Sequence, residues 1–246
     1  LGVDHSLAPP TARPLAHSQA PTRWHRMAAA LKNARGMPSL FPHGAPGIFA
    51  CGILPAALYG SEHYAPAAAD ISKLRSAAVR AWGPQPWGVP HDIAMLLYPT
   101  LQDPMFIAIW APLHRWAREC WLATHPDPAH TDCLTEEEIS LAAFRVATHS
   151  ARPLPQGPLL ALQSALTALG WQLSPPFGVR NHEGTILNLG HGSPALLRHD
   201  VRARVQDIQE QLIEARLSQR PDWAIQKPHW PLVRRVLQSK RPTKRQ

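Results

Sequence analysis

The chain has 246 residues, of which 45% are apolar, and its net charge at pH 7 is +8. This length and apolar content suffice for one sizeable domain or two small ones. The sequence has no run of about 18 apolar residues, so it predicts no membrane span, and no charged segment followed by an apolar one at its start, so it predicts no signal peptide. Three unevenly spaced cysteines favour reduced thiols over a disulfide framework. The 27 prolines favour many short elements with irregular connections over an all-helical bundle of long rods.

The first 64 residues predict a strand, a basic helix and a short buried helix. Leu1 to Asp4 has the pattern of a strand, so we expect the sequence to be a piece of a longer protein, and residues 5–21 form a Pro-rich loop. A helix follows from the N-cap Thr22 to about Ala34. The next helix ends in the turn Tyr59-Gly60-Ser61-Glu62, in which the glycine suits a left-handed C-cap. Its apolar residues at helical spacing predict a buried face: Phe49, Ile53, Leu54, Ala57 and Leu58.

Residues 68–122 predict two helices on either side of a break. The first runs from about Ala68 to Trp82, and the second from its N-cap Asp103 to about Leu122. Residues 83–90 are rich in Gly and Pro and mark a domain boundary, while residues 91–97 form a short helix.

Each of these two helices has an expected buried face. In the first helix it consists of Ile71, Leu74, Ala78, Val79 and Trp82, with Lys73, Arg75 and Arg80 pointing elsewhere. In the second it consists of Phe106, Ile109, Trp110, Leu113, Trp116, Ala117, Cys120 and Trp121. Three tryptophans on a stripe suit base stacking in single-strand binders, but their helical spacing favours a core.

The last third of the sequence predicts helices and one small hairpin. Thr135 to Glu138 matches a capping box that opens a helix to about His149, with Ile139, Ala142, Ala143 and Val146 inward. Further helices are expected at 158–169, stopping at Gly170, and at 231–238. Residues 171–173 and 185–189 alternate as a hairpin joined through 181–184.

A long helix begins at Ser193, the N-cap, and Pro194. Its expected buried face consists of Leu197, Val201, Val205, Ile208, Leu212 and Ala215, and Arg198, Arg202, Arg204 and Arg216 decorate the rest. The predicted fold class is therefore mainly α, with a helical bundle, a second helical region, one small hairpin near 171–189 and Pro-rich connections.

Basic residues gather in two segments. The first, on the helix near the N-terminus, carries Arg23, Arg26, Lys32 and Arg35. The second, from Trp223 to Gln246, has no acid and carries Lys227, Arg234, Arg235, Lys240, Arg241, Lys244 and Arg245. Such cations bind phosphate backbones through counterion release without reading sequence. A solvated surface helix and a disordered basic tail account for the same charges.

Cys120, His125, His130 and Cys133 place four possible zinc ligands within a short stretch. Their order and residue types differ from those of a zinc knuckle, and Cys120 also lies on the apolar stripe. An ordinary core residue followed by a loop is therefore favoured over a metal site.

Common catalytic and nucleotide-binding motifs are missing from the sequence. The sequence contains no Asp-Asp pair, no Walker-type Gly-Lys-Ser/Thr, no Gly-x-Gly-x-x-Gly, no Gly-x-Ser-x-Gly and no His-Glu-x-x-His. No catalytic constellation is predicted.

Several short motifs, in this order, resemble those of non-LTR (LINE-type) retrotransposon reverse transcriptases. Leu1-Gly2-Val3-Asp4 is similar to the strand that closes the palm of these enzymes, and Leu58-Tyr-Gly-x-Glu62 to the end of a helix downstream of the polymerase core. Gly170-Trp171 and the run from Gly192 to Leu197 look like later landmarks. The resemblance is strong over residues 1–64 and loose after about residue 100.

The resemblance implies a C-terminal fragment downstream of the catalytic palm. Its parts would be the last palm strand (1–4), a thumb-like helical region (5–83), a linker with a short helix (84–102), a helical connection region (103–226) and a basic tail (227–246). The parent would be an RNA-directed DNA polymerase whose aspartates hold Mg²⁺. This fragment lacks them, so it would be inactive alone and would need no cofactor.

The implied partners are an RNA–DNA hybrid or duplex nucleic acid and the missing palm and fingers domains, in the nucleus or cytoplasm and away from membranes. Two other classes of protein fit the same sequence. One is a helical protein-interaction domain, or a decayed retroelement relic, with a disordered basic tail. The other is a zinc-stabilised binding module.

Overall fold

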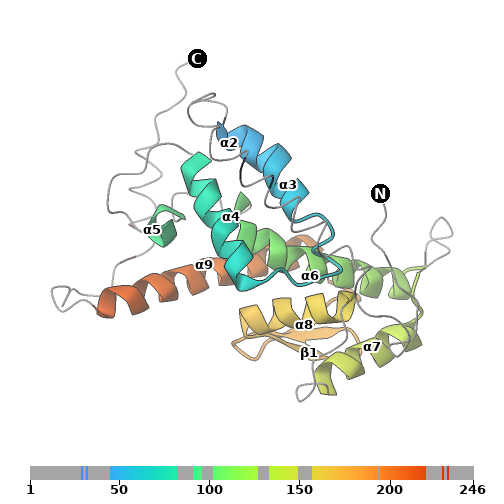
Figure 1. Ribbon diagram of the computed structural model, residues 1–246. Helices are drawn as coiled ribbons and strands as arrows, with labels where there is room; N and C mark the ends of the chain where they lie inside the picture. Colours follow the sequence, from blue (N-terminus) through green and yellow to red (C-terminus); the bar gives the residue numbers. More distant parts are fainter. Residues whose placement is uncertain are drawn as a thin grey trace, which may run out of the picture.

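A computed structural model describes residues 45–81, 91–95, 102–126, 133–148, 157–192 and 194–219, together with Ala29, Lys32, His229 and Leu232. The described chain is mostly helical with one small antiparallel sheet, which confirms the predicted fold class (Figure 1). The helices are α2 (Ala45–Ile48), the π-helix η2 (Phe49–Ile53), α3 (Leu54–Ala57), α4 (Ala68–Ala81), α5 (His91–Met95), α6 (Pro104–Thr124), α7 (Glu136–Thr148), α8 (Pro158–Leu169) and α9 (Pro194–Ser218). The strands are β1 (Gln172–Ser174), β2 (Gly178–Arg180) and β3 (Ile186–Asn188).

Two hydrophobic clusters meet at α6. One is formed by α2, η2, α3, α4 and α5, and the other by α6, α7, α8, the sheet and α9. Ile107 of α6 packs against both clusters. Figure 1 shows α2, α3 and α4 on one side of α6, with α8 and the sheet on the other. The long helix α6 is therefore the element on which the rest is assembled.

The predicted helix before Tyr64 is confirmed in its burial and in its end. All five apolar residues expected on its inner face are buried, and Phe49 is completely so. Gly60 takes the left-handed conformation with φ 77°, which a residue without a side chain adopts at no steric cost. The chain then turns back, and α4 packs its buried Leu74, Ala78 and Val79 into the same cluster.

Helix α6 begins as predicted at its N-cap. The Asp103 carboxylate accepts a hydrogen bond from the Met105 N–H at 2.9 Å, and Pro104 occupies the first turn. Six of the eight predicted stripe residues are buried, among them Trp116. Trp110 is half-buried and the Trp121 side chain is 36% exposed, so the edge of the stripe lies at the surface.

The ends of α7 and α8 follow from local chemistry. Thr135 and Glu138 form the expected capping box: the Thr135 N–H donates to Oε2 of Glu138 at 2.8 Å, and the Glu138 N–H donates to Oγ1 of Thr135 at 3.3 Å. Helix α8 spans the predicted residues and stops at Gly170, whose φ is 69°. Arg204, expected to lie at the surface of α9, instead donates from Nε to the last carbonyl of α8, Leu169 O, at 3.0 Å.

The sheet contains a strand that alternation did not reveal. Its order is β1-β2-β3, and Val179 of β2 pairs with Leu173 on one side and Leu187 on the other. The two predicted strands therefore do not pair with each other, although the predicted turn at 181–184 does lead into β3. β2 has only three residues, too few for a period-two pattern, and becomes recognisable through the burial of Val179 at its centre.

The buried face of α9 agrees with prediction in its first half only. Leu197, Val201 and Val205 are buried, but Leu212 and Ala215 are exposed, and Gln209 and Ile213 are buried in their place. Buried positions that recur every four residues drift round a helix of 3.6 residues per turn. A different side of α9 therefore turns inward in its second half, where Gln209 is buried against Asp103 at the start of α6.

Several predictions lie outside the described residues. They are the strand at 1–4, the helices at 22–34 and 231–238 except for the helical residues Ala29, Lys32 and Leu232, and most of the linker at 84–102. The proposed domain boundaries stay predictions. Among the helices that the structure describes, none is both long and apolar enough to cross a bilayer.

Candidate nucleic-acid interface

One edge of α6 carries aromatic and cationic side chains at the surface. They recur at intervals of four, four, three and four residues, which places them on one face of a helix. These residues, which we call the α6 row, are Trp110, His114, Arg118, Trp121 and His125. All are exposed except Trp110, which is half-buried. The α6 row flanks the buried stripe, so the same helix supplies the core and presents this surface.

Aromatic rings of the α6 row contact other rings at both ends of the row. Trp110 lies between Phe106, with ring centroids 6.3 Å apart, and His114, at 5.0 Å. At the other end the rings of Trp121 and His125 are nearly parallel, with centroids 3.9 Å apart. Arg118 lies between the two groups in sequence, so aromatic and positive groups alternate along α6.

Helix α9 brings further positive charge to the α6 row. Burial and the nearby charges of Arg118 and Arg198 hold the pKa of His114 below its ordinary value. Arg198 belongs to α9 and is exposed, as is Arg202 one turn later. Both charges that act on His114 in this α6–α9 seam are positive, so they disfavour protonation of its ring.

The loop after β3 is fixed against the C-terminal end of the row. Thr124 donates from Oγ1 to the Gly190 carbonyl at 2.7 Å, across 66 residues of sequence. The His191 ring meets the His125 ring edge-on at 5.9 Å, and both side chains are exposed. Nδ1 of His125 also lies 3.0 Å from Oγ1 of Thr124. This end of the row is thus held by tertiary contacts as well as by the helix.

A buried polar cluster fixes α4, α6 and α9 relative to one another. Asp103, only 1% exposed, receives Nε of Arg75 from α4 at 3.2 Å and a short hydrogen bond from Nε2 of Gln209 on α9. Burial raises the pKa of the Asp103 carboxyl, and Arg75, the Met105 N–H and Gln209 oppose that rise.

This cluster also corrects the prediction that Arg75 points away from the interior. Its side chain is only 11% exposed, because the carboxylate on α6 compensates its burial. Since Asp103 opens α6 and meets Gln209 late in α9, while Arg198 early in α9 acts on His114, the two helices run antiparallel.

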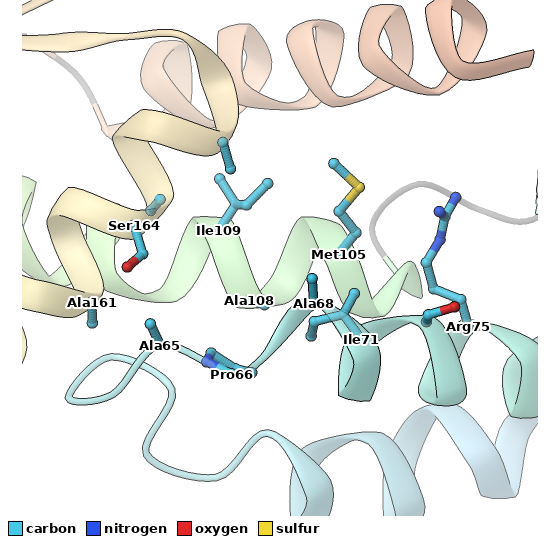
Figure 2. Close-up of a pocket in the computed structure, with 13 residues that line it drawn as sticks. Ala65, Pro66, Ala68, Ile71, Arg75, Met105, Ala108, Ile109, Ala161 and Ser164 are labelled. Atoms are coloured by element: carbon cyan, nitrogen blue, oxygen red, sulfur yellow. The ribbon is translucent and has the colours of Figure 1, made fainter. Parts of the chain in front are cut away.

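A cavity of about 350 Å³ lies between α4, α6 and α8 (Figure 2). Its walls are mainly alanine and other apolar side chains, with Ser72, Ser164 and Arg75 as the polar ones. Figure 2 places Arg75 and Met105 at one end and Ser164 at the other. Because Arg75 is paired with buried Asp103, the cavity is suited chemically to a small apolar group and offers little to a polyanion.

Almost all nucleic-acid-binding residues predicted from sequence lie outside the described residues. The exception is Lys32, which is helical and exposed. The α6–α9 seam was not predicted as a contact, although the intervals of the α6 row are visible in the sequence. The sequence does not show that Arg198 of α9 lies near α6, because Arg198 is 80 positions after Arg118.

The zinc interpretation stays a prediction, because His130 lies outside the described residues. Cys120 is buried, and burial, with a smaller effect of Glu119, raises the pKa of its thiol to about 12. A thiol ligates zinc as the thiolate, so this environment opposes metal binding at Cys120. Among the described residues, no group of three His, Cys, Asp or Glu side chains is arranged to hold a metal ion.

No known protein family, curated protein or solved structure matches this chain.

Proposed function

We propose that this chain is the nucleic-acid-gripping, C-terminal portion of a non-LTR retrotransposon reverse transcriptase. The sequence resemblance motivates the proposal, and the observation that carries it is the positive seam in which Arg118 of α6 and Arg198 of α9 both act on His114. Phosphate contacts need cations held on one side of a scaffold, and they position a nucleic acid without reading it.

In this proposal the chain grips an RNA–DNA hybrid or duplex while a palm domain on another segment performs polymerisation with Mg²⁺. The predicted basic residues at 23–35 and 227–245 add contacts to those of the seam. The contacts of Asp103 with Arg75 and Gln209 support this role, because phosphate-binding residues on different helices must keep their relative positions when a nucleic acid binds.

The test is the salt dependence of binding to a fluorescein-labelled RNA–DNA hybrid, followed by fluorescence anisotropy of the full chain. If several phosphates are neutralised, affinity falls steeply between about 50 and 200 mM salt. Arg198→Gln should lower the slope of log affinity against log salt by about 0.9, the value for one lost phosphate contact. Arg216→Gln, at the far end of the same helix, is the matched control.

Neutralising Arg234 and Arg235 together tests the C-terminal basic segment in the same assay. Absence of hybrid binding at low salt, or binding that is indifferent to salt, would overturn the proposal.

A second candidate is a helical protein-interaction domain, which a different surface favours. Leu141 and Phe144 on α7 are 52% and 60% exposed, and Leu134, which precedes the helix, is 38% exposed. Apolar side chains grouped on one helix face mark protein contacts more often than nucleic-acid contacts. Indifference to nucleic acid, combined with self-association that Phe144→Ser abolishes in sedimentation velocity, would favour this function.

A further inference from the structure

The cavity between α4, α6 and α8 has a rim that reaches solvent and a floor that belongs to the core. Ala68, Ser72 and Ala168 line the cavity and are exposed, so they mark its open side. Ile109 and Ala165 also line it and are buried, so they form its floor. A small molecule can therefore enter from solvent and reach apolar side chains of the core.

Small side chains keep this space open. Ala108 supplies one of them from α6. One face of α8 contributes four more at intervals of three, one and three positions, and none is larger than serine: Ala161, Ser164, Ala165 and Ala168. Packed interiors contain few voids larger than a water molecule, so a cavity of about 350 Å³ exceeds what imperfect packing leaves.

Water is held poorly in this cavity, because its walls offer few polar groups. The polar lining residues are Ser72, Ser164 and Arg75, and a buried water needs about two to four hydrogen-bond partners. Arg75 pairs with Asp103 at 3.2 Å, so its charge is already compensated. An anionic ligand would lose its hydration without meeting an uncompensated cation, whereas a neutral apolar ligand avoids this cost.

The cavity also lies where the two hydrophobic clusters meet. Ile71 and Ala108 pack against the cluster of α2 to α5, whereas Ile109 and Ala165 belong to the cluster of α6 to α9. Pockets for small molecules commonly form between packed helices. The cavity is lined by 13 residues, fewer than the about 20–30 that each partner contributes to a standard protein interface. Its size therefore favours a small molecule over a protein partner.

We propose that this cavity binds a neutral, largely apolar molecule about the size of a bicyclic aromatic compound, with one hydrogen-bonding group. Ser164, at the end opposite Arg75, supplies a hydroxyl for that group (Figure 2). The size follows from the volume, because a cavity of about 150 Å³ holds benzene and this one is more than twice as large. The inference goes beyond the proposed function, since no residue of the α6 row lines the cavity.

Isothermal titration calorimetry of the full chain with 2-naphthol tests the site. This probe is neutral, has two fused rings and carries one hydroxyl. With about eleven non-hydrogen atoms it should bind at one site with a dissociation constant between about 10 μM and 1 mM. The anion 2-naphthoate, which has the same rings, should bind about tenfold more weakly or worse, because burial strips its carboxylate of water.

Two substitutions in the cavity locate the binding. Ala108→Leu fills part of the space, so it should weaken 2-naphthol binding about tenfold or more and leave the unfolding midpoint unchanged or higher. Ser164→Ala removes only the hydroxyl and should weaken binding about threefold to tenfold, as expected for one hydrogen bond. Ala203→Leu is the matched control, because Ala203 is an exposed residue of α9 that does not line the cavity.

Circular dichroism verifies that each variant is folded, and Ser164→Ala decides the matter if Ala108→Leu does not fold. Absence of 2-naphthol binding to the unsubstituted chain overturns the site. Binding that Ala108→Leu and Ser164→Ala leave unchanged, or that Ala203→Leu lowers equally, places the probe elsewhere and also overturns it. Tighter binding of 2-naphthoate than of 2-naphthol overturns the assignment to neutral ligands.

Discussion

Replacing Asp103 with alanine should destabilise this fold strongly, because one carboxylate joins three helices. The side chain is 1% exposed, pairs with Arg75 at 3.2 Å, accepts from Gln209 and caps α6 through the Met105 N–H at 2.9 Å. Removing one partner of a buried ion pair costs about 3–5 kcal/mol, and losing an N-cap costs about 1 kcal/mol. These terms overlap, so we expect a loss of about 4 kcal/mol.

Urea unfolding followed by circular dichroism measures this loss. With an m-value of about 3 kcal/mol/M, the upper end for small proteins, the midpoint should fall by about 1.3 M. Arg115→Ala is the control: it breaks the Arg115–Glu119 pair on α6, in which Arg115 is 50% exposed, and should cost about 0.5 kcal/mol or less.

A double substitution tests whether the cost comes from the buried charge. Asp103→Asn preserves the cap and the bond from Gln209, and Arg75→Met replaces the unpaired cation with an apolar side chain of similar length. The double variant should recover more than half of the stability lost in Asp103→Ala. The reasoning is refuted if Asp103→Ala costs less than about 1 kcal/mol or if the double variant is no better than Asp103→Ala.

Three further predictions concern local features. Gly170→Ala should lower unfolding stability by about 1–2 kcal/mol, because φ is 69° there, whereas Gly47→Ala, in a helix with open space around it, should raise it by about 0.5–1 kcal/mol; urea unfolding measures both. Cys120, with a thiol pKa of about 12, should react with a disulfide reagent at pH 8 only after unfolding, and fast modification of the native chain at this residue would contradict its burial. Hydrogen bonds from Thr135 lower the pKa of Glu138 in the fold, so its contribution to stability is present above the ordinary pKa and is lost as pH falls through the folded value. Glu138→Gln, which keeps the side-chain length but removes the titrating group, should remove that pH dependence from thermal unfolding measured between pH 3 and 6, a range that brackets the ordinary pKa of about 4.3.

Where local chemistry sets a boundary, the sequence was sufficient. The Thr135–Glu138 box, the Asp103 cap and Gly170 each satisfy or release backbone groups within a few residues, so their effect needs no knowledge of the rest of the chain. The apolar stripe of α6 was predictable for the same reason, since one helix face reveals itself by spacing alone.

Where a partner lies far away in sequence, prediction failed. Arg75 was expected at the surface because a buried arginine needs a carboxylate partner, and its own helix offers none on that side. Its partner Asp103 is 28 positions away in the sequence. The second half of α9 turns a different side inward, where Gln209 is buried against Asp103, 106 positions away in the sequence. In both cases the residue's own neighbours in sequence carry no trace of the contact.

The sequence by itself determined the caps at Asp103, Thr135 and Gly170 and the inner face of α6, because each depends on interactions over one or two turns. It also determined the excess of positive charge, which follows from composition alone. Only the tertiary structure decided which cations share a surface. Arg118 and Arg198 lie on helices separated by the whole of α7, α8 and the sheet, and the antiparallel packing that brings them to His114 is fixed through Asp103 and Gln209. The net charge of the chain follows from its composition, whereas the positions of its charged side chains relative to one another follow from how the helices pack.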